Sequence, residues 1–428
     1  MAIYSGEFID LENPVLVIGE MGLVRSLGEM DLPLFLGTEI EKNIAAHSRY
    51  VKQRFFFSPY DSEEFIDELC ELGYYFKKKP VILSDDDRAI LNISENRNKL
   101  KAYYLFLYPE RKTVNKILNK QYFSELAERH ELPVPVSYQT TSSRDFREVA
   151  SKINYPCIIK PTQRHFWWGD DFIEQMGHYQ KAVKCSDLYQ FKDTCQKISE
   201  VNPSVVIQEY VEGDDKQHYS ANLFVDERGK LQGYYIARKK RIYPIKAGTG
   251  SYVETVVNPA VLEISMKIVE KLGLRGLVNI QFKQDSRTAE YKLLEIHARN
   301  SLWSLLGAKA GANLAYLYYN YLVYGLHHDN VIKARPNIKY FNLSKDVRAL
   351  LAYRNEGKLT VAEWWQSLRG ERIFAAFSWK DPLPALFKIW DIVLNSLKRA
   401  VKKKLPQPKR LKHESFLTRN ASFLTRIF

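Results

Sequence analysis

Short apolar segments, strand-like or helical, that each carry one polar side chain recur between residues 112 and 299 of this 428-residue chain. Apolar runs of this length are typical of buried strands, so the pattern predicts a sheet. A charge on a buried strand is either paired within the fold or directed at a ligand, and each residue alone could be a paired structural charge. The ordered set favours a common site, and its members are Lys120, Lys160, Glu209, Gln281, Glu295 and Arg299.

The N-terminal part of the chain alternates apolar and helical segments. Residues 14–18, 34–36 and 81–83 are strand-like, and residues 62–72 have a helical pattern. Alternation of this kind is typical of a small α/β domain with a parallel sheet. The sequence therefore predicts such a domain over residues 1–111.

Two groups of residues in this domain have both a functional and a structural interpretation. Gly19 and Gly22 follow the first strand, but the full GxGxxG pattern is absent, so a structural turn is favoured over a nucleotide contact. Asp85, Asp86 and Asp87 could form a metal cluster. A solvated helix start is favoured instead, because acidic residues stabilise the first turn of a helix.

A second region begins at about residue 112. The helical pattern of residues 112–132 ends at Pro133, and residues 260–272 and 302–326 are also predicted to be helical. Residues 162–170 have the composition of a loop. The predicted strands, the last two of which form a hairpin, are residues 155–161, 205–211, 219–225, 231–238, 252–257, 277–282 and 291–297.

Three motifs resemble those of one enzyme superfamily. They read QEYVEGDD from Gln208, NIQFK from Asn279 and LLEIHARN from Leu293. The first resembles the adenine hinge of the ATP-grasp superfamily, and the other two resemble the metal-binding strands of its carbamoyl-phosphate synthetase branch. The similarity covers residues 112–320, and D-aspartate ligase-type carboxylate-amine ligases resemble the chain most.

The resemblance implies a fold of mixed α/β and α+β class. Residues 1–111 would form a Rossmann-like pre-ATP-grasp domain, and residues 112–204 and 205–328 the two lobes of an ATP-grasp fold. Residues 329–428 would be a helical, basic extension. The second lobe would contain the metal and phosphate site.

The resemblance also implies roles for individual residues, with ATP and Mg²⁺ as cofactors. The ATP contacts would be Lys120, Lys160, Gln208, Glu209, Val211, Asp214 and Asp215, with the ribose contact left open between the last two. The metal ligands would be Gln281, Glu295 and His297, and the catalytic residues Arg299, Lys239 and Arg241. Oxygen ligands suit magnesium, and cations offset the charge that develops when a phosphoryl group is transferred.

Two features depart from the superfamily pattern. His297 stands where an asparagine usually binds metal, and imidazole is a poor magnesium ligand, so a hydrogen-bonded core histidine is an equal alternative. The loop at residues 162–170 contains only Gly169, although the lid over the phosphates is usually glycine-rich. Side chains could replace those backbone contacts, and the candidates are Arg164, His165, Trp167 and Trp168.

The net charge and the composition reduce the number of functional classes to which this chain could belong. The net charge of +13 favours anionic partners, but no RNA- or DNA-binding module is recognisable, so nucleic acid ranks last. The four cysteines lack zinc or redox spacing, and no leader or membrane span is apparent, which favours the cytoplasm. We therefore expect a carboxylate-amine ligase that takes an amino acid as one substrate. A catalytically weak ATP-binding scaffold at the membrane surface is the alternative, and homo-oligomers remain open.

The C-terminal extension contains a predicted amphipathic helix. Apolar residues recur at helical spacing over residues 386–401, and basic residues crowd positions 398–412. A helix of this kind can lie on an anionic membrane surface, or it can dock on its own domain ahead of a solvated tail. The first alternative would make the protein membrane-associated and its substrate a cell-envelope or polysaccharide precursor.

Overall fold

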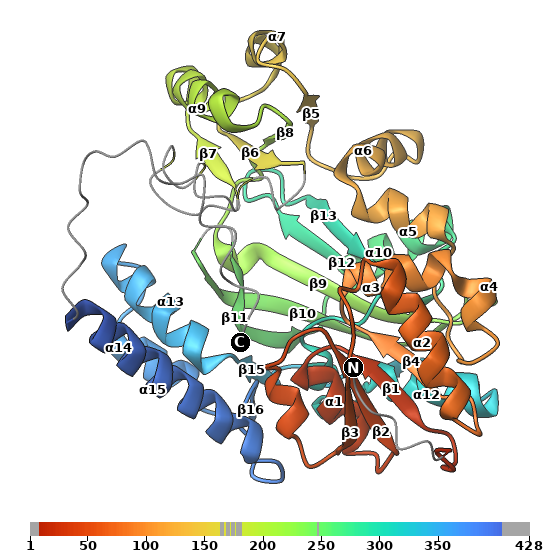
Figure 1. Ribbon diagram of the computed structural model, residues 1–428. Coiled ribbons are helices and arrows are strands. Elements are labelled where there is room, and N and C mark those ends of the chain that lie inside the picture. The colour runs from red at the N-terminus through yellow and green to blue at the C-terminus, as the bar shows by residue number, and fades with distance from the viewer. Residues whose placement is uncertain are drawn as a thin grey trace, which may run out of the picture.

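The computed structural model describes residues 8–162, 182–245 and 248–404, together with Trp167, Phe172 and Met176. Its N-terminal sheet has the order β3-β2-β1-β4 and is parallel throughout (Figure 1). The strands are β1 (Val15–Ile18), β2 (Leu34–Thr38), β3 (Val51–Phe56) and β4 (Val81–Ser84). This confirms the predicted parallel sheet. The sequence analysis missed β3, because this edge strand exposes Lys52, Gln53 and Arg54 and lacks an apolar run.

Helices follow β1, β3 and β4 of this sheet. The first is α1 (Met21–Gly28), and α2 (Glu63–Tyr75) starts after Ser62, whose hydroxyl accepts from the Phe65 amide. The short α4 (Arg97–Leu100) follows α3 (Asp87–Glu95), which Asp86 caps. The predicted helix start at the three aspartates is therefore confirmed. Their predicted solvation is wrong for Asp85, which is buried between the ends of β1 and β4.

A four-stranded sheet forms the next unit, with the order β5-β8-β6-β7. Its strands are β5 (Ser137–Thr140), β6 (Cys157–Pro161), β7 (Val183–Cys185) and β8 (Val205–Glu209), and its helices include α7 (Asp145–Lys152) and α9 (Leu188–Val201). β8 pairs with β5 and β6. Backbone pairing thus places β8, which follows the predicted lobe boundary at residue 204, in this sheet.

Two long helices expected from the sequence are each divided. Residues 112–132 form α5 (Arg111–Leu118) and α6 (Lys120–Arg129), because Asn119 between them has an extended backbone. Residues 302–326 form α11 (Ser304–Lys309) and α12 (Leu314–Tyr324). Gly311 lies between these two with a φ of 99°, a conformation that glycine adopts without a steric penalty.

The largest sheet among the described residues has eight strands, in the order β13-β12-β9-β10-β11-β15-β16, with β14 paired to β10. They are β9 (His218–Val225), β10 (Leu231–Tyr243), β11 (Thr249–Val256), β12 (Gly276–Gln284), β13 (Tyr291–His297), β14 (Ile332–Lys333), β15 (Lys339–Phe341) and β16 (Arg372–Phe374). The predicted hairpin of β12 and β13 is confirmed. Helix α10 (Pro259–Leu272) ends at a left-handed Gly273, as its sequence predicts.

The C-terminal segment is part of this body. β15 and β16 extend the large sheet, and α13 (Leu343–Asn355), α14 (Val361–Ser367) and α15 (Leu383–Lys404) lie beside it (Figure 1). Arg25 of α1 forms a buried ion pair with Asp381, 3.0 Å between Nε and Oδ2. Among the helices that the structure describes, none has the length and apolar character needed to cross a bilayer.

One hydrophobic core joins the N-terminal sheet to the large sheet. Buried residues of α2 and β4 belong to the same cluster as residues of β9, α10 and β12. The Tyr318 hydroxyl, on α12, accepts from the Leu107 amide at 2.6 Å. This packing brings the N-terminal end of α3 against the end of β13, where the candidate site lies.

Candidate functional site

Gln281 and Glu295 form the centre of the candidate site. They are direct partners in the antiparallel register of β12 and β13, so their side chains share one face of the sheet. The Glu295 side chain is about half exposed, at 48%. Gln281 Oε1 accepts from Lys239 Nζ at 3.1 Å. The pair thus presents two oxygen donors side by side, next to a cation.

These oxygens fit the ligand chemistry that Mg²⁺ prefers, and they are the residues that would hold it. Mg²⁺ commonly takes only one or two protein carboxylates and completes its shell with water and phosphate. The described residues include no group of three or more His, Cys, Asp or Glu side chains arranged around a metal position.

His297 links the site to the N-terminal domain. Its Nδ1 lies 3.1 Å from both carboxylate oxygens of Asp87, 210 residues away in the chain, and its Nε2 lies 3.3 Å from Glu295 Oε2. Arg299 grips the same Asp87 carboxylate through Nε at 2.7 Å and Nη2 at 3.0 Å. Asp87 therefore anchors two residues of the predicted site.

The charges of this cluster determine its protonation. Burial alone would raise the pKa of Asp87, but His297 and Arg299 hold it well below its usual range. Burial and the charge of Arg299 disfavour the imidazolium of His297, yet Asp87 and Glu295 outweigh them and raise its pKa. Both ring nitrogens of His297 face carboxylate oxygens, so the side chain bridges Asp87 and Glu295. Its role as a metal ligand stays a prediction.

Buried and half-buried lysines lie near Gln281 and Glu295. Lys160 Nζ donates to Gln208 Oε1 at 2.9 Å, and burial lowers its pKa while Glu295 acts in the opposite direction. Burial also lowers the pKa of Lys283, which donates to the Val211 carbonyl at 2.8 Å. Together with Lys239, these lysines form a cluster that would be stabilised by a polyanion.

The sequence analysis did not select Lys283 or His218. Burial lowers the pKa of His218 well below the usual value, and Lys239, Lys283 and Lys160 add to this, so a neutral imidazole lies among the lysines. Lys283 follows Gln281 by two residues and hence shares its face of β12. That spacing could have identified Lys283. His218 had no such signal, since only the pairing of β9 with β12 places it opposite Lys283.

The predicted adenine hinge follows β8. Both polar atoms of the Gln208 side chain make hydrogen bonds within the fold, since Nε2 donates to Ser137 Oγ at 2.9 Å and Oε1 accepts from Lys160. Glu209 lies 3.5 Å from Arg287. Of the two predicted ribose contacts, Asp215 accepts from the Tyr353 hydroxyl at 2.6 Å, whereas Asp214 is exposed. The geometry therefore favours Asp214 as the ribose contact.

Other predicted site residues lie apart from this centre or outside the description. Arg241 makes a bidentate ion pair with Asp346, at 2.7 and 3.0 Å, and both side chains are buried. Trp167 is buried and stacks on Phe172 at 4.5 Å, so it is a core residue rather than a phosphate contact. The side chain of Lys120 lies outside the described residues, as do Arg164, His165 and Trp168.

A further acidic group lies where β1 and β4 end. Asp85 Oδ2 accepts from the Glu20 amide at 3.1 Å, and burial together with the charge of Glu20 raises the pKa of Asp85 to about 7. An added Cβ on Gly19 would lie 2.4 Å from Asp85 Oδ1. Gly19 thus serves close packing of two loops, which agrees with the structural interpretation favoured from the sequence.

Comparison with known proteins connects this geometry to one group of ligases. Residues 201–345 match the family model described as ATP-grasp in the biosynthetic pathway with Ter operon. D-aspartate ligase of Enterococcus faecium is 24% identical over 245 residues, which cover 56% of this chain and 57% of that ligase. The N-terminal section of the carbamoyl phosphate synthase large chain of Methanopyrus kandleri is 28% identical over 188 residues, or 42% of this chain and 30% of that protein.

The alignments span less than two thirds of each of these relatives. Among solved structures, N5-carboxyaminoimidazole synthetase from Staphylococcus aureus superposes with a TM-score of 0.58 at 14% identity. That superposition covers 82% of this chain and 88% of the synthetase. It supports a shared fold over most of this chain.

Proposed function

We propose that this chain is an ATP-dependent ligase of the ATP-grasp type that joins a carboxylate to an amine, because residues 201–345 match an ATP-grasp family model. ATP would phosphorylate the carboxylate, and the amine would then attack the acyl phosphate to give an amide, ADP and phosphate. Because the acyl phosphate is itself the activated species, the protein needs no covalent nucleophile. Its task is to bind, orient and neutralise charge.

One observation carries the proposal: the oxygen donors of Gln281 and Glu295 are direct register partners, and a cluster of buried lysines lies beside them. Lys160, Lys239 and Lys283 would hold the phosphate oxygens of ATP. Mg²⁺, held by Gln281 and Glu295, would supply charge neutralisation at the transferred phosphoryl group. Oxygen ligands and cations in such proximity are what phosphoryl transfer requires.

Arg299 would act on the transferred group as well. Its guanidinium is fixed by two bonds to Asp87 and by a third, from Nη1 to the Asn300 carbonyl at 3.0 Å. Holding an arginine in one orientation before substrate binds lowers the cost of reorganisation during reaction. Asp87 is therefore a positioning residue, and His297 couples that position to Glu295.

The substrates are the less constrained part of the proposal. Similarity to D-aspartate ligase supports an amino acid as one substrate, and attachment to a cell-envelope or polysaccharide precursor remains the specific form predicted from the sequence. We place the reaction in the cytoplasm, where ATP is available. The scaffold alternative differs in one measurable respect, since it binds ATP without turnover.

The test is phosphate release from ATP and Mg²⁺ in the presence of single amino acids. We expect release that depends on an amino acid in the wild type and falls at least 100-fold in Glu295→Gln, which keeps the shape of the side chain but removes its charge. Glu290→Gln is the matched control, because Glu290 is exposed in the turn between β12 and β13 and pairs with Lys292.

Calorimetry with ATP and Mg²⁺ separates the alternatives. Loss of binding in Lys160→Met, together with amino-acid-dependent release in the wild type, supports the ligase. Tight binding of ATP with no release for any amino acid or amine would support the scaffold instead. Absence of ATP binding would contradict both.

A further inference from the structure

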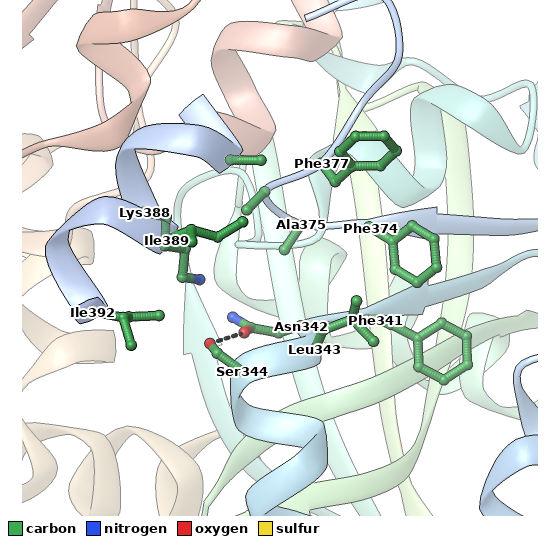
Figure 2. Close-up of a pocket in the computed structure, with 12 residues that line it drawn as sticks. Phe341, Asn342, Leu343, Ser344, Phe374, Ala375, Phe377, Lys388, Ile389 and Ile392 are labelled. Atoms are coloured by element: carbon green, nitrogen blue, oxygen red, sulfur yellow. Dashed lines mark hydrogen bonds between the residues drawn. The ribbon is translucent and has the colours of Figure 1, made fainter. Parts of the chain in front are cut away.

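An apolar groove lies between α15 and the segment that joins β15 to α13 (Figure 2). Its cavity volume is about 170 Å³. Ile389 and Ile392 of α15 line one side, and Ala375 and the aromatic side chains of β15 and β16 line the other. The polar groups of the groove gather at Asn342, Ser344 and Lys388.

The groove has the size of one amino-acid side chain. A cavity of about 150 Å³ lined by apolar side chains accommodates a benzene molecule, so this groove can hold a phenyl or a branched aliphatic group. Its lining consists mostly of apolar side chains and would release water when such a group enters. Ser344 Oγ donates to Asn342 Oδ1 at 3.0 Å, so these two polar groups satisfy each other rather than requiring a polar ligand.

The polar end of the groove carries both signs of charge. Lys388 lines the groove, and its charge and that of Lys345 act on Glu20, countering the effect of burial on the pKa of this carboxyl group. Glu20 lies two residues after the end of β1. The opposite charges of Glu20 and of these two lysines match the two charges of an amino acid, whose ammonium would meet Glu20 and whose carboxylate would meet the lysines.

Contacts connect this charged end to the candidate active site. Lys345 Nζ donates to Thr249 Oγ1 at 3.2 Å, and the Asn342 amide donates to the Ser251 carbonyl at 2.8 Å. Both partners belong to β11, which pairs with the strand that carries Lys239. On the other side, the Glu20 amide binds Asp85, whose charge acts on Arg299. These contacts connect the groove to β11 and to the loop that follows β1.

We propose that this groove binds the apolar side chain of an amino-acid substrate, whose ammonium and carboxylate groups are held by Glu20 and by Lys345 and Lys388. This inference rests on the proposed ligase function and specifies its substrate class: an amino acid with an aromatic or branched aliphatic side chain. The C-terminal segment, which supplies both lysines and one side of the groove, is then a specificity element of the enzyme.

Two substitutions that change the groove in opposite directions test the proposal in the full-length protein. Ala375→Leu fills the groove, and Ile389→Ala widens it. We expect Ala375→Leu to raise the KM for phenylalanine and leucine at least tenfold and to change the KM for ATP and alanine less than twofold. Ile389→Ala shifts the preference toward larger side chains. Trp390→Ala is the matched control, because Trp390 adjoins Ile389, is 62% exposed and does not line the groove.

The outcomes distinguish this inference from the function on which it rests. The inference is overturned if amino-acid-dependent phosphate release shows no preference for large apolar side chains, or if neither groove variant changes it. Either result leaves the proposed ligase function standing. If no turnover occurs at all, calorimetry with phenylalanine decides, since binding that is lost in Ala375→Leu and in Glu20→Gln supports the groove. Binding of decanoate that phenylalanine does not displace would assign the groove to an acyl chain. Phenylalanine binding that appears only after removal of residues 405–428 would assign it to the chain's own tail. Either result overturns the inference.

Discussion

At the scale of single residues, three consecutive aspartates show how far position decides chemistry. Asp86 caps α3, Asp87 holds His297 and Arg299, and Asp85 is buried with a pKa raised to about 7. Identical side chains thus serve as a cap, a positioning group and a buried acid. Burial and the neighbouring charges, rather than residue type, separate these roles.

The buried acid predicts a specific pH dependence of stability. Between about pH 4 and pH 7, native Asp85 holds a proton that the unfolded chain has lost, so the free energy of unfolding falls as pH rises through this window. The contribution is about 4 kcal/mol at most, since each pKa unit corresponds to about 1.4 kcal/mol. Asp85→Asn keeps the acceptor for the Glu20 amide and should raise the thermal midpoint at pH 8 relative to wild type, with a much smaller difference at pH 5.

Thermal unfolding at both pH values checks this prediction. Asp61→Asn, which alters an exposed carboxylate of the same domain, is the control and should behave as wild type at both. An Asp85→Asn protein whose midpoint differs from wild type equally at pH 5 and pH 8 would contradict the assignment.

At the scale of secondary-structure elements, two cations of β10 differ in their partners. Lys239 and Arg241 are only two residues apart, but they bind side chains on different elements. Lys239 reaches Gln281 on β12, whereas Arg241 pairs with Asp346 on α13. Asp346 is fully buried and also accepts from Ser251 Oγ and from Trp364 Nε1, both at 2.8 Å. The ion pair therefore ties β10 and β11 to α13 and α14.

The two cations should respond differently to substitution. Breaking a buried ion pair by removing one partner costs about 3–5 kcal/mol, so Arg241→Met should lower the thermal midpoint by several degrees. Lys239→Met should leave the midpoint close to wild type and reduce amino-acid-dependent phosphate release. Thermal unfolding and phosphate release, measured on both variants, check the contrast. An Arg241→Met protein of unchanged midpoint that has lost turnover would restore the catalytic role predicted for Arg241 from the sequence.

At the scale of the whole molecule, the C-terminal segment contacts the N-terminal domain and also exposes apolar side chains. Lys42 of the N-terminal domain lies 3.4 Å from Asp391 on α15, and the ring of Phe387 stacks on that of His47. The same helix leaves Leu386, Trp390 and Val393 about half exposed. The two alternatives drawn from the sequence are therefore compatible, because one face of α15 contacts the domain while another is apolar and accessible.

An accessible apolar face next to a basic sequence predicts attraction to an anionic bilayer. The basic side chains at positions 398–412 and the repeated segments at residues 415–419 and 422–426 lie outside the described residues. We expect the full chain to sediment with phosphatidylserine vesicles at low salt and to be released at high salt. A chain that ends at Leu394 retains the groove residues and should stay in the supernatant. Vesicle pelleting checks this, and equal failure of both chains to sediment would remove the motivation for a membrane role.

Much of the fold could be predicted from local pattern. The parallel N-terminal sheet, the β12–β13 hairpin and the end of α10 at Gly273 followed from apolar runs and a helix stop signal. The sequence did not reveal the edge strand β3, the division of two helices or the pairing of β8. Edge strands carry little hydrophobic signal, and strand pairing depends on partners far away in the chain.

The candidate site, like the fold, has features that the sequence predicts and features that only the structure reveals. The sequence by itself determined which side chains can bind phosphate and magnesium, and its motifs placed Gln281 and Glu295 on neighbouring strands. Only the tertiary structure brought Asp87 to His297 and Arg299 across about 210 residues, paired Arg241 with Asp346, and placed His218 among three lysines. The physical reason is that chemical capacity is a property of a residue and its neighbours along the strand. Charge, protonation and orientation depend instead on partners that only the packing of distant segments supplies.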